Sequence, residues 1–389
     1  MELVRSPHHR PLRSVGPLLV RGSVAALLAS CVAGVGLHGQ ATWSLAERPA
    51  LTIGAPDGRD GHALFDIRGA VVADAGVVVV ADGGSSEVRV FDQNGLLLQS
   101  IGGPGDGPRE FRDVSWIDTC GSEGVLVYDT RRNRLTRWTV DGELLDGFPI
   151  DGPVRDLPPY EVKCGPSGRF VVLGWPDVSV RRERGPYRAM VPLGLADARG
   201  KLIRSLGTVP GTERMRTTNN DRPHPFGRTT TVDLFDGEVY VATADSFSIQ
   251  VLAPDGSRRH FGLNQPVTRL SKREQESWVD AYLERAPADQ RPSLKRAILE
   301  TGWVPSSPPA LATFIVDATG RTWVRPYEVG PLNPDGLVEW TVFDRRGEAV
   351  ATASIPRGLR PTDIGQAHIL GVRRDALGME TVELWELYR

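Results

Sequence analysis

The sequence predicts an all-β protein, a six-bladed β-propeller made of four-stranded antiparallel blades. Three observations support this prediction. A sequence pattern recurs after roughly 45 residues, which is the length of a propeller blade. Short alternating hydrophobic segments are joined by Asn-Gly or Asp-Gly pairs, the strongest local signal for a β-hairpin. The 389 residues include 43 Gly and 30 Pro without a collagen period, which is typical of a chain with many tight turns.

The repeat is clearest near the beginning of the mature chain. Residues 51–58 (LTIGAPDG) resemble residues 99–107 (QSIGGPGDG), and Ile53 and Ile101 are 48 positions apart. Strands are predicted at Val77–Ala81, Glu87–Asp92, Leu96–Ile101, Val125–Asp129, Arg134–Val140 and Glu143–Phe148. The turns Asn94-Gly95 and Asp141-Gly142 between them are predicted to be type I′, which requires two successive residues with positive φ.

The same pattern predicts the innermost strand of each blade. Candidate inner strands lie near Ile67, Val114, Tyr160, Thr229, Leu311 and Asp363. The last unit has room for only three strands, whereas Leu51–Ile53 forms a strand with no unit of its own. We therefore predict that Leu51–Ile53 completes the C-terminal blade, which would remove an exposed sheet edge. Five or seven blades remain open, because the third and sixth units are weakly marked.

The N-terminal residues 1–41 are predicted to be a targeting segment, with residues 42–389 forming a single propeller domain. Basic residues up to Arg21 precede an apolar stretch, 22–36, that is too short to span a membrane as a helix. Two cleavage patterns compete. Leu28–Cys31 resembles a lipobox, which would make Cys31 a lipidation site, and Gly39–Ala41 fits ordinary signal peptidase; an uncleaved anchor is a third alternative. Each predicts export to the periplasm, the outer membrane or the medium.

Several segments carry a resemblance to a known group. Residues 80–95 (VADGGSSEVRVFDQNG), followed by Ile101-Gly102, resemble an NHL-type repeat. Residues 105–111 (GDGPREF) resemble the inter-blade linker of exported bacterial six-bladed propellers of the TolB-like superfamily, and residues 316–324 (VDATGRTWV) are similar to a late-blade motif of that group. The resemblance covers residue 51 to the C-terminus. It implies a fold rather than a function, because the group includes binding scaffolds as well as lactonases, arylesterases and lyases.

The lengths of the connections predict where a site lies. Nearly all long connections fall on the propeller face that carries the links between blades: 102–112, 175–187, 207–227, 263–309 and 326–336. Functional residues concentrate on long loops held by a rigid scaffold. The ligand-binding residues predicted on this long-loop face are Arg109, Trp175, Arg182, Arg216, His224, Trp303 and Tyr327. Arg182 and Arg216, with their basic neighbours, suggest either a basic lip for an anionic ligand or an ordinary solvated charged loop.

The longest connection is predicted to contain a helical insertion at about 270–305, between blades 4 and 5. Ser271 and Glu274 fit a capping box, and Trp278, Ala281 and Tyr282 recur at helical spacing. A second helix is predicted over Ser293–Thr301. The pair would either cover the channel as a lid or docking hairpin, or pack its aromatic stripe on the adjoining blade.

Motifs for catalysis are missing from the sequence. There is no HxH or HExxH pair and no GxSxG nucleophile elbow, so no zinc site and no catalytic residue are predicted. The residues Asp66, Asp113, Glu161 and Asp233 lie near the starts of inner strands, where hydrolytic propellers hold calcium, but capping and turn roles also explain them. No cofactor is expected unless the protein is an enzyme, in which case Ca²⁺ or another divalent ion would be needed.

Two cysteines remain apart from Cys31. Cys120 and Cys164 are 44 residues apart and occupy the same register in adjacent blades. Export permits a disulfide between them, whereas the distance between equivalent inner strands argues against one. The sequence leaves both states open.

Two classes of function follow. The first is a non-catalytic exported platform that binds a protein, peptide or glycan over the central channel. The alternative is a divalent-metal-dependent hydrolase or lyase, similar to a lactonase or esterase, with its site in the channel mouth. The formal net charge of −2 points to neither nucleic acid nor an anionic membrane surface as a partner. Membrane contact is expected only through an N-terminal lipid, and the protein is expected to be a monomer.

Overall fold

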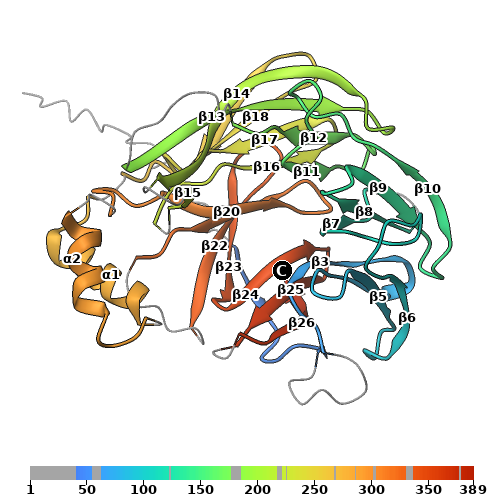
Figure 1. Ribbon diagram of the computed structural model, residues 1–389, viewed down its shortest axis with the longest axis horizontal. Helices are drawn as coiled ribbons and strands as arrows, with labels where there is room; N and C mark the ends of the chain where they lie inside the picture. The colour runs from blue at the N-terminus through green and yellow to red at the C-terminus, as the bar shows by residue number, and fades with distance from the viewer. Residues whose placement is uncertain are drawn as a thin grey trace, which may run out of the picture. The chain divides into compact units, whose positions relative to one another are not determined.

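Antiparallel strands are the predominant regular structure of the described residues (Figure 1). The computed structural model describes residues 41–54, 63–121, 124–176, 185–216, 221–224, 226–266, 269–284, 286–300, 304–329, 336–375 and 378–389. Cys31, Arg182 and Trp303 lie outside the described residues. In the part of the chain that is described, no helix is long and apolar enough to cross a membrane.

The first three sheets follow the chain in order. The first comprises β3 (Ile67–Val72), β4 (Val78–Asp82), β5 (Glu87–Phe91) and β6 (Leu97–Gly102), with a short 3-10 helix η2 (Asp74–Gly76) after β3. The second comprises β7 (Val114–Asp118), β8 (Val125–Asp129), β9 (Arg134–Trp138) and β10 (Leu144–Phe148). The third comprises β11 (Glu161–Cys164), β12 (Phe170–Leu173), β13 (Gly185–Ala196), β14 (Leu202–Arg216) and β15 (Asp221–Pro223).

The remaining strands repeat the pattern, with the two ends of the chain joined. The fourth sheet comprises β16 (Thr231–Phe235), β17 (Glu238–Ala242), β18 (Ser248–Leu252) and β19 (Arg258–Gly262). The last strands are β20 (Leu311–Val316), β21 (Thr322–Pro326), β22 (Leu337–Phe343), β23 (Ala349–Pro356), β24 (Leu359–Ile364), β25 (His368–Arg374) and β26 (Glu380–Tyr388). Two helices, α1 (Lys272–Leu283) and α2 (Arg291–Glu300), lie between β19 and β20. Ser271 and Glu274 form a reciprocal capping box at the start of α1.

Both N-terminal strands pair with strands from the C-terminal part of the chain. Strand β2 (Leu51–Ile53) runs antiparallel to β26, which is the pairing that the sequence predicts. Strand β1 (Ala41–Leu45) was not predicted: it pairs in parallel with β23 and reaches β26 at Ser44 and Leu45. This strand therefore joins two four-stranded arrays into one continuous sheet. Its segment is short and has no hairpin partner nearby in the sequence, so local patterning could not identify it.

The first strand of each group of consecutive antiparallel strands lies toward the centre of Figure 1. These inner strands follow one another around the centre in the order β3, β7, β11, β16, β20 and β24. Strand β3 packs beside both β7 and β24, and β16 packs beside β11 and β20. A disulfide joins the ends of β7 and β11. Beyond β20, the Ala318 amide donates to the carbonyl of Ile364 in β24 at 3.2 Å. Four-stranded antiparallel sheets arranged around a common centre are the architecture of a β-propeller.

Two expectations about local structure were wrong. Of each predicted type I′ pair, only the glycine has a positive φ: Gly95 at 81° and Gly142 at 80°. The Gly95 amide donates to the Asp92 carbonyl at 3.0 Å, which is the three-residue hairpin with a left-handed glycine at its end. In addition, parts of the predicted loops 175–187 and 207–227 are strands, because β13 and β14 continue beyond the blade as a ribbon. Glycine and proline within these strands obscure the alternation on which the prediction depended.

Candidate functional site

Ionisable side chains gather on the inner strands around the centre of the ring. Asp118 ends β7, Glu161 and Lys163 lie on β11, Asp233 lies on β16 and Asp363 lies on β24. All five are half-buried. Each inner strand is the edge of its sheet, so a side chain there keeps some accessible surface while protein encloses it on most sides.

These groups influence one another electrostatically. The pKa of Asp118 is raised to about 6, chiefly by burial. The carboxylates of Asp363 and Asp233 also raise it, whereas the hydrogen bond from the Cys120 amide and the charge of Lys163 lower it. Burial also raises the pKa of Glu161 and of Asp233, and Lys163 again acts in the opposite direction. Lys163 therefore partly neutralises a group of carboxyls that would otherwise repel one another.

Two of these carboxylates hold the backbone of a neighbouring sheet. Asp233 accepts hydrogen bonds from the amides of Val316 at 2.8 Å and Leu234 at 2.9 Å. Asp363 accepts one from the amide of Val72 at 2.9 Å. An inner strand has unpaired amides on its free edge, and a buried amide without a partner is costly. Asp233 therefore has a structural role, but it joins two sheets from within β16 instead of capping the start of its own strand, the role considered from the sequence.

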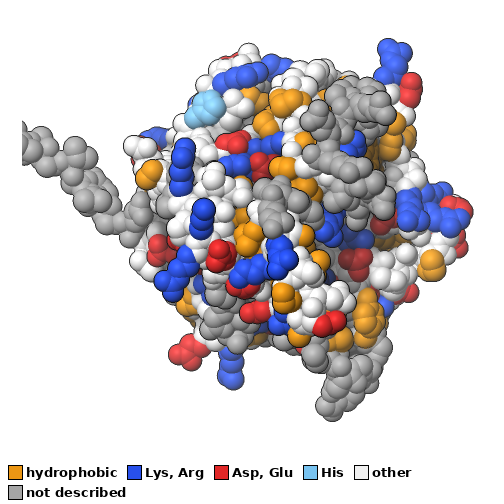
Figure 2. All heavy atoms as spheres, turned by 60° about the vertical axis from the view of Figure 1, so that its left-hand side comes forward, with side chains coloured by type: hydrophobic (Ala, Val, Ile, Leu, Met, Phe, Trp, Pro, Cys, Tyr) orange, Lys and Arg blue, Asp and Glu red, His pale blue; other side chains and the backbone are white. Residues whose placement is uncertain are grey.

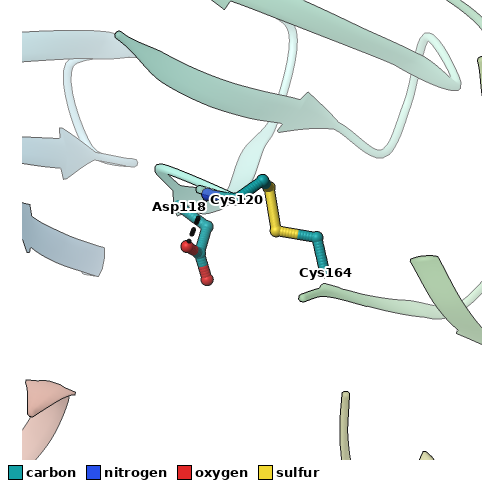
Figure 3. Close-up of side chains that lie close together, drawn as sticks. All are labelled: Asp118, Cys120 and Cys164. Carbon is teal, nitrogen blue, oxygen red and sulfur yellow. Dashed lines mark hydrogen bonds between the residues drawn. A yellow bond between two sulfur atoms is a disulfide. The ribbon is translucent and has the colours of Figure 1, made fainter. Parts of the chain in front are cut away.

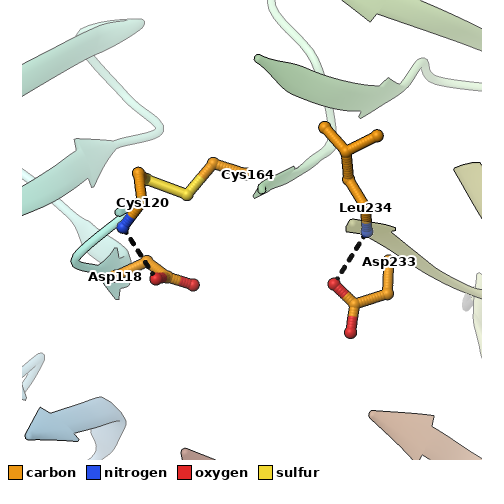
Figure 4. Close-up of a disulfide and its surroundings, with 5 residues drawn as sticks. All are labelled: Asp118, Cys120, Cys164, Asp233 and Leu234. Atoms are coloured by element: carbon orange, nitrogen blue, oxygen red, sulfur yellow. Dashed lines mark hydrogen bonds between the residues drawn. A yellow bond between two sulfur atoms is a disulfide. The ribbon is translucent and has the colours of Figure 1, made fainter. Parts of the chain in front are cut away.

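Among the described residues, groups that could bind a metal ion come close together at one place. In the described ranges, three potential ligand atoms come within 4.8 Å of one another only at Asp118, Cys120 and Cys164. The two sulfurs are bonded to each other, as Figure 3 shows, and a disulfide sulfur is not the thiolate that binds metals. Figure 4 shows that Asp118 and Asp233 approach the centre from separate strands. In the described part of the chain, no three carboxylate, histidine or thiolate groups are therefore close enough together to share a metal ion.

An exposed aromatic pair marks the start of β11. Tyr160 and Trp175 are each 42% exposed, and their rings meet edge to face with centroids 5.5 Å apart. The Tyr160 amide donates to the Leu173 carbonyl at 2.8 Å, so the pair lies where β11 begins and β12 ends. Burial and the neighbouring Glu161 raise the pKa of Tyr160, which remains a neutral phenol. The sequence predicts Trp175 as a ligand-binding residue, whereas it identifies Tyr160 only as lying near an inner strand.

The ribbon beside this pair contains a charge cluster centred on Asp221. Although burial acts in the opposite direction, hydrogen bonds from Tyr187, Arg214 and Arg216 lower the pKa of Asp221 to about 2. The Tyr187 hydroxyl donates at 2.6 Å, Arg214 at 2.8 Å and Arg216 at 2.9 Å. Arg216 of the suggested basic lip and its neighbour Arg214 thus share one carboxylate, whereas Arg182 lies outside the described residues. On the face in Figure 2, basic and acidic side chains are interspersed.

The aromatic stripe of α1 packs on neighbouring connections. Phe226 lies 4.3 Å from Trp278 and 5.4 Å from Tyr282, measured between ring centroids, and Tyr327 lies 5.7 Å from Trp278. Burial raises the pKa of Tyr327 to about 12. His224 is buried beside Phe226, and its Nδ1 accepts from the Phe226 amide at 3.1 Å. Tyr327 and His224, both predicted to bind a ligand, therefore lie in or against the small core under the helices.

Arg109 lies apart from these groups. Its guanidinium sits 5.1 Å from the centre of the Trp138 ring and donates to the Gly142 carbonyl at 2.8 Å. These contacts hold the link between the first two sheets against the second. Of the predicted residues that the structure describes, Trp175 is the only aromatic side chain that is exposed, at 42%.

Comparisons with known proteins give distant structural similarities. No protein-family model and no curated protein sequence matches this chain. A DUF4221 family member from Bacteroides vulgatus is 9% identical, with a TM-score of 0.49, over 90% of this chain and 99% of that one. Regucalcin from Agrobacterium tumefaciens, a calcium-binding protein, is 13% identical, with a TM-score of 0.43, over 90% and 96%. Virginiamycin B lyase from Staphylococcus aureus is 10% identical, with a TM-score of 0.38, over 86% and 82%. Similarities this distant carry no inference about a ligand.

Sequence reasoning missed Asp118, Lys163 and Asp363 as parts of the inner group. The sequence contains a signal for two of them. Asp118 lies two residues before Cys120, and Lys163 lies one residue before Cys164. The two cysteines occupy equivalent register positions in adjacent blades. The convergence of four inner strands could not be recognised from the sequence, since it depends on how the ring closes.

Proposed function

We propose that this chain is an exported six-bladed β-propeller that binds a protein, peptide or glycan on its long-loop face, over the central channel. The observation that carries the proposal is the exposed pair Tyr160 and Trp175 at the start of β11. Large aromatic side chains are expensive to leave in water and are enriched where partners bind. The β13–β15 ribbon stands beside the pair, because the Gly174 amide donates to the Pro192 carbonyl of β13 at 2.8 Å. The charge cluster around Asp221 makes this ribbon polar.

The helical insertion at about 270–305 borders the same face in this proposal. Its aromatic stripe is occupied by Phe226 and Tyr327, which favours a structural ornament over a mobile lid. Deletion of 270–305 is therefore expected to leave ligand capture largely intact. Loss of capture on deletion would favour the lid.

The test is a screen of the full chain on a glycan array and on a peptide library. Any ligand found should bind at least about tenfold more weakly to Trp175→Ala, as expected for an interface anchor. Leu98→Ala is the matched control, because Leu98 is also exposed but lies on β6. Equal loss in both variants, or no loss in Trp175→Ala, would overturn the assignment of the site.

The second class, a divalent-metal-dependent hydrolase or lyase, has support only from the inner-strand carboxylates. Their oxygens are engaged by backbone amides and Lys163 lies among them, so a metal would have to rearrange the group. Calorimetric titration of the full chain with Ca²⁺ tests this alternative. Micromolar binding that Asp118→Asn abolishes would favour the metal enzyme over the platform.

A further inference from the structure

A disulfide joins two neighbouring inner strands at the edge of the ring centre. Cys164 is the last residue of β11, and Cys120 follows the end of β7 by two residues. Their Cα atoms are 5.5 Å apart, and each residue is 6% exposed. Elsewhere in the ring, carboxylates and backbone amides connect the inner strands, as at Asp233 and Val316. Here the connection is covalent.

A carboxyl group lies against this bond. One Asp118 oxygen and the two sulfurs all lie within 4.8 Å of one another (Figure 3). The Cys120 amide donates to Asp118 Oδ1 at 3.1 Å, and Cys120 has a left-handed backbone with φ of 52°. This turn folds the chain back, so that the Cys120 side chain comes beside the carboxyl two residues earlier.

A disulfide that serves only to stabilise the fold does not need a carboxyl beside it. An apolar neighbour would protect the sulfurs at lower cost than an enclosed carboxyl. Burial also raises the pKa of Asp118 to about 6, so this carboxyl gains and loses its proton at a higher pH than an ordinary aspartate. The charged groups that face it are Lys163 on β11, which lowers this pKa, and Asp363 and Asp233 on β24 and β16, which raise it.

We propose that Cys120–Cys164 is a redox-active disulfide and that Asp118 is its acid–base group, with a small dithiol as the reductant. The thiolate of the dithiol attacks one sulfur, forming a mixed disulfide and breaking the Cys120–Cys164 bond. The departing cysteine thiolate takes the proton of the Asp118 carboxylic acid, directly or through one water. Whichever sulfur departs, it is within reach of the same carboxyl.

The second half-reaction completes the balance. The other thiol of the reductant loses its proton to solvent and attacks the mixed disulfide, releasing a cyclic disulfide and the second cysteine, which is protonated from solvent. Two electrons pass from the dithiol to the protein. On reoxidation by a disulfide, the Asp118 carboxylate accepts the proton of the attacking cysteine thiol.

The experiment measures reduction of the folded full chain by dithiothreitol between pH 5 and pH 8, with alkylation and mass spectrometry as the readout. Rates are divided by the concentration of dithiothreitol thiolate, so that only the protein's own pH dependence remains. As Asp118 ionises it should repel both the incoming and the departing thiolate. The normalised rate should therefore fall by about tenfold or more as pH rises through about 6.

Asp118→Asn retains an acceptor for the Cys120 amide and should show no such fall. Asp233→Asn is the matched control, because Asp233 is a second inner-strand carboxyl that bonds Val316 and Leu234 instead. It should keep the full fall in rate, with the midpoint moved to slightly lower pH, because the Asp233 carboxylate raises the pKa of Asp118. Lys163→Met provides an independent measurement: losing this cation should move the midpoint to higher pH. The same slope in Asp118→Asn as in the wild type would overturn the proposal, as would reduction that occurs only at the rate of global unfolding.

Discussion

The carboxylate of Asp233 accepts a hydrogen bond from the backbone amide of Val316, at 2.8 Å, across the boundary between two sheets. Asp363 and Val72 repeat this arrangement at 2.9 Å, although they lie 291 positions apart in the chain. In both pairs the amide belongs to the last residue of an inner strand. The Asp363–Val72 bond closes the ring between its last and first sheets. It is the same kind of contact as the Asp233–Val316 bond, which joins two consecutive sheets.

Asp233→Ala should lower the free energy of unfolding by about 2 kcal/mol, because the Val316 amide would lose its partner in an enclosed place. Asp233→Asn should lose less, since it retains an acceptor oxygen. The exposed Asp146, which pairs with Arg137 at 3.4 Å, is the control, and its replacement by Ala should change stability by no more than about 0.5 kcal/mol. Urea denaturation followed by circular dichroism measures all three. Equal losses in Asp233→Ala and Asp146→Ala would contradict this role.

Asp118 should make stability depend on pH. Its pKa is about 6 in the folded protein, above the ordinary value of 3.8. The folded state therefore binds the Asp118 proton more tightly than the unfolded state does. The free energy of unfolding gains this contribution in full below pH 4 and loses it as pH rises through 6. With partial exposure taken into account, the loss should be about 2 kcal/mol. Asp118→Asn should reduce this decline, which denaturation at pH 4 and pH 7.5 with the disulfide intact would measure; an unchanged decline would mean that another group is responsible.

Trp43 should contribute strongly to stability although it lies on a short N-terminal strand. It is 7% exposed, its ring centroid is 5.3 Å from that of Trp323, and the guanidinium of Arg389 lies 4.8 Å above it. Trp43→Ala should therefore cost about 3–5 kcal/mol. Trp175→Ala, which removes a half-exposed ring, should cost far less. Thermal and urea denaturation measure the loss of stability in both variants. If Trp43→Ala and Trp175→Ala lose similar amounts, β1 is not part of the core.

Phe226 should hold the helices against the propeller. Phe226→Ala removes its ring contacts with Trp278 and Tyr282, so protection of the amides in α1 from hydrogen exchange should fall by about tenfold or more. Protection in β17 should not change, because the helices have their own small core. Leu294→Ala, at an exposed position of α2, is the control. A parallel loss of protection in β17 would mean that helices and sheets unfold together.

The sequence alone predicted much of the fold. The alternation in 125–129 and 134–148 located β8, β9 and β10 to within two residues, and the Leu51–Ile53 strand was correctly paired with the C-terminal strand. These predictions succeeded because hairpin periodicity and glycine turns are local properties. Strand β1 and the ribbon β13–β14 were missed, since the first has only distant partners and the second contains glycine and proline.

Only the tertiary structure decided which side chains meet. The sequence could place Cys120 and Cys164 in the same register of two repeats, but whether they were close enough to bond depended on how closely β7 and β11 approach. Asp118 attracted no notice in the sequence, where it precedes a turn like many other aspartates. It becomes chemically distinctive because the ring places it against a disulfide and opposite Lys163, Asp233 and Asp363, and such distances are set by ring closure rather than by any local pattern.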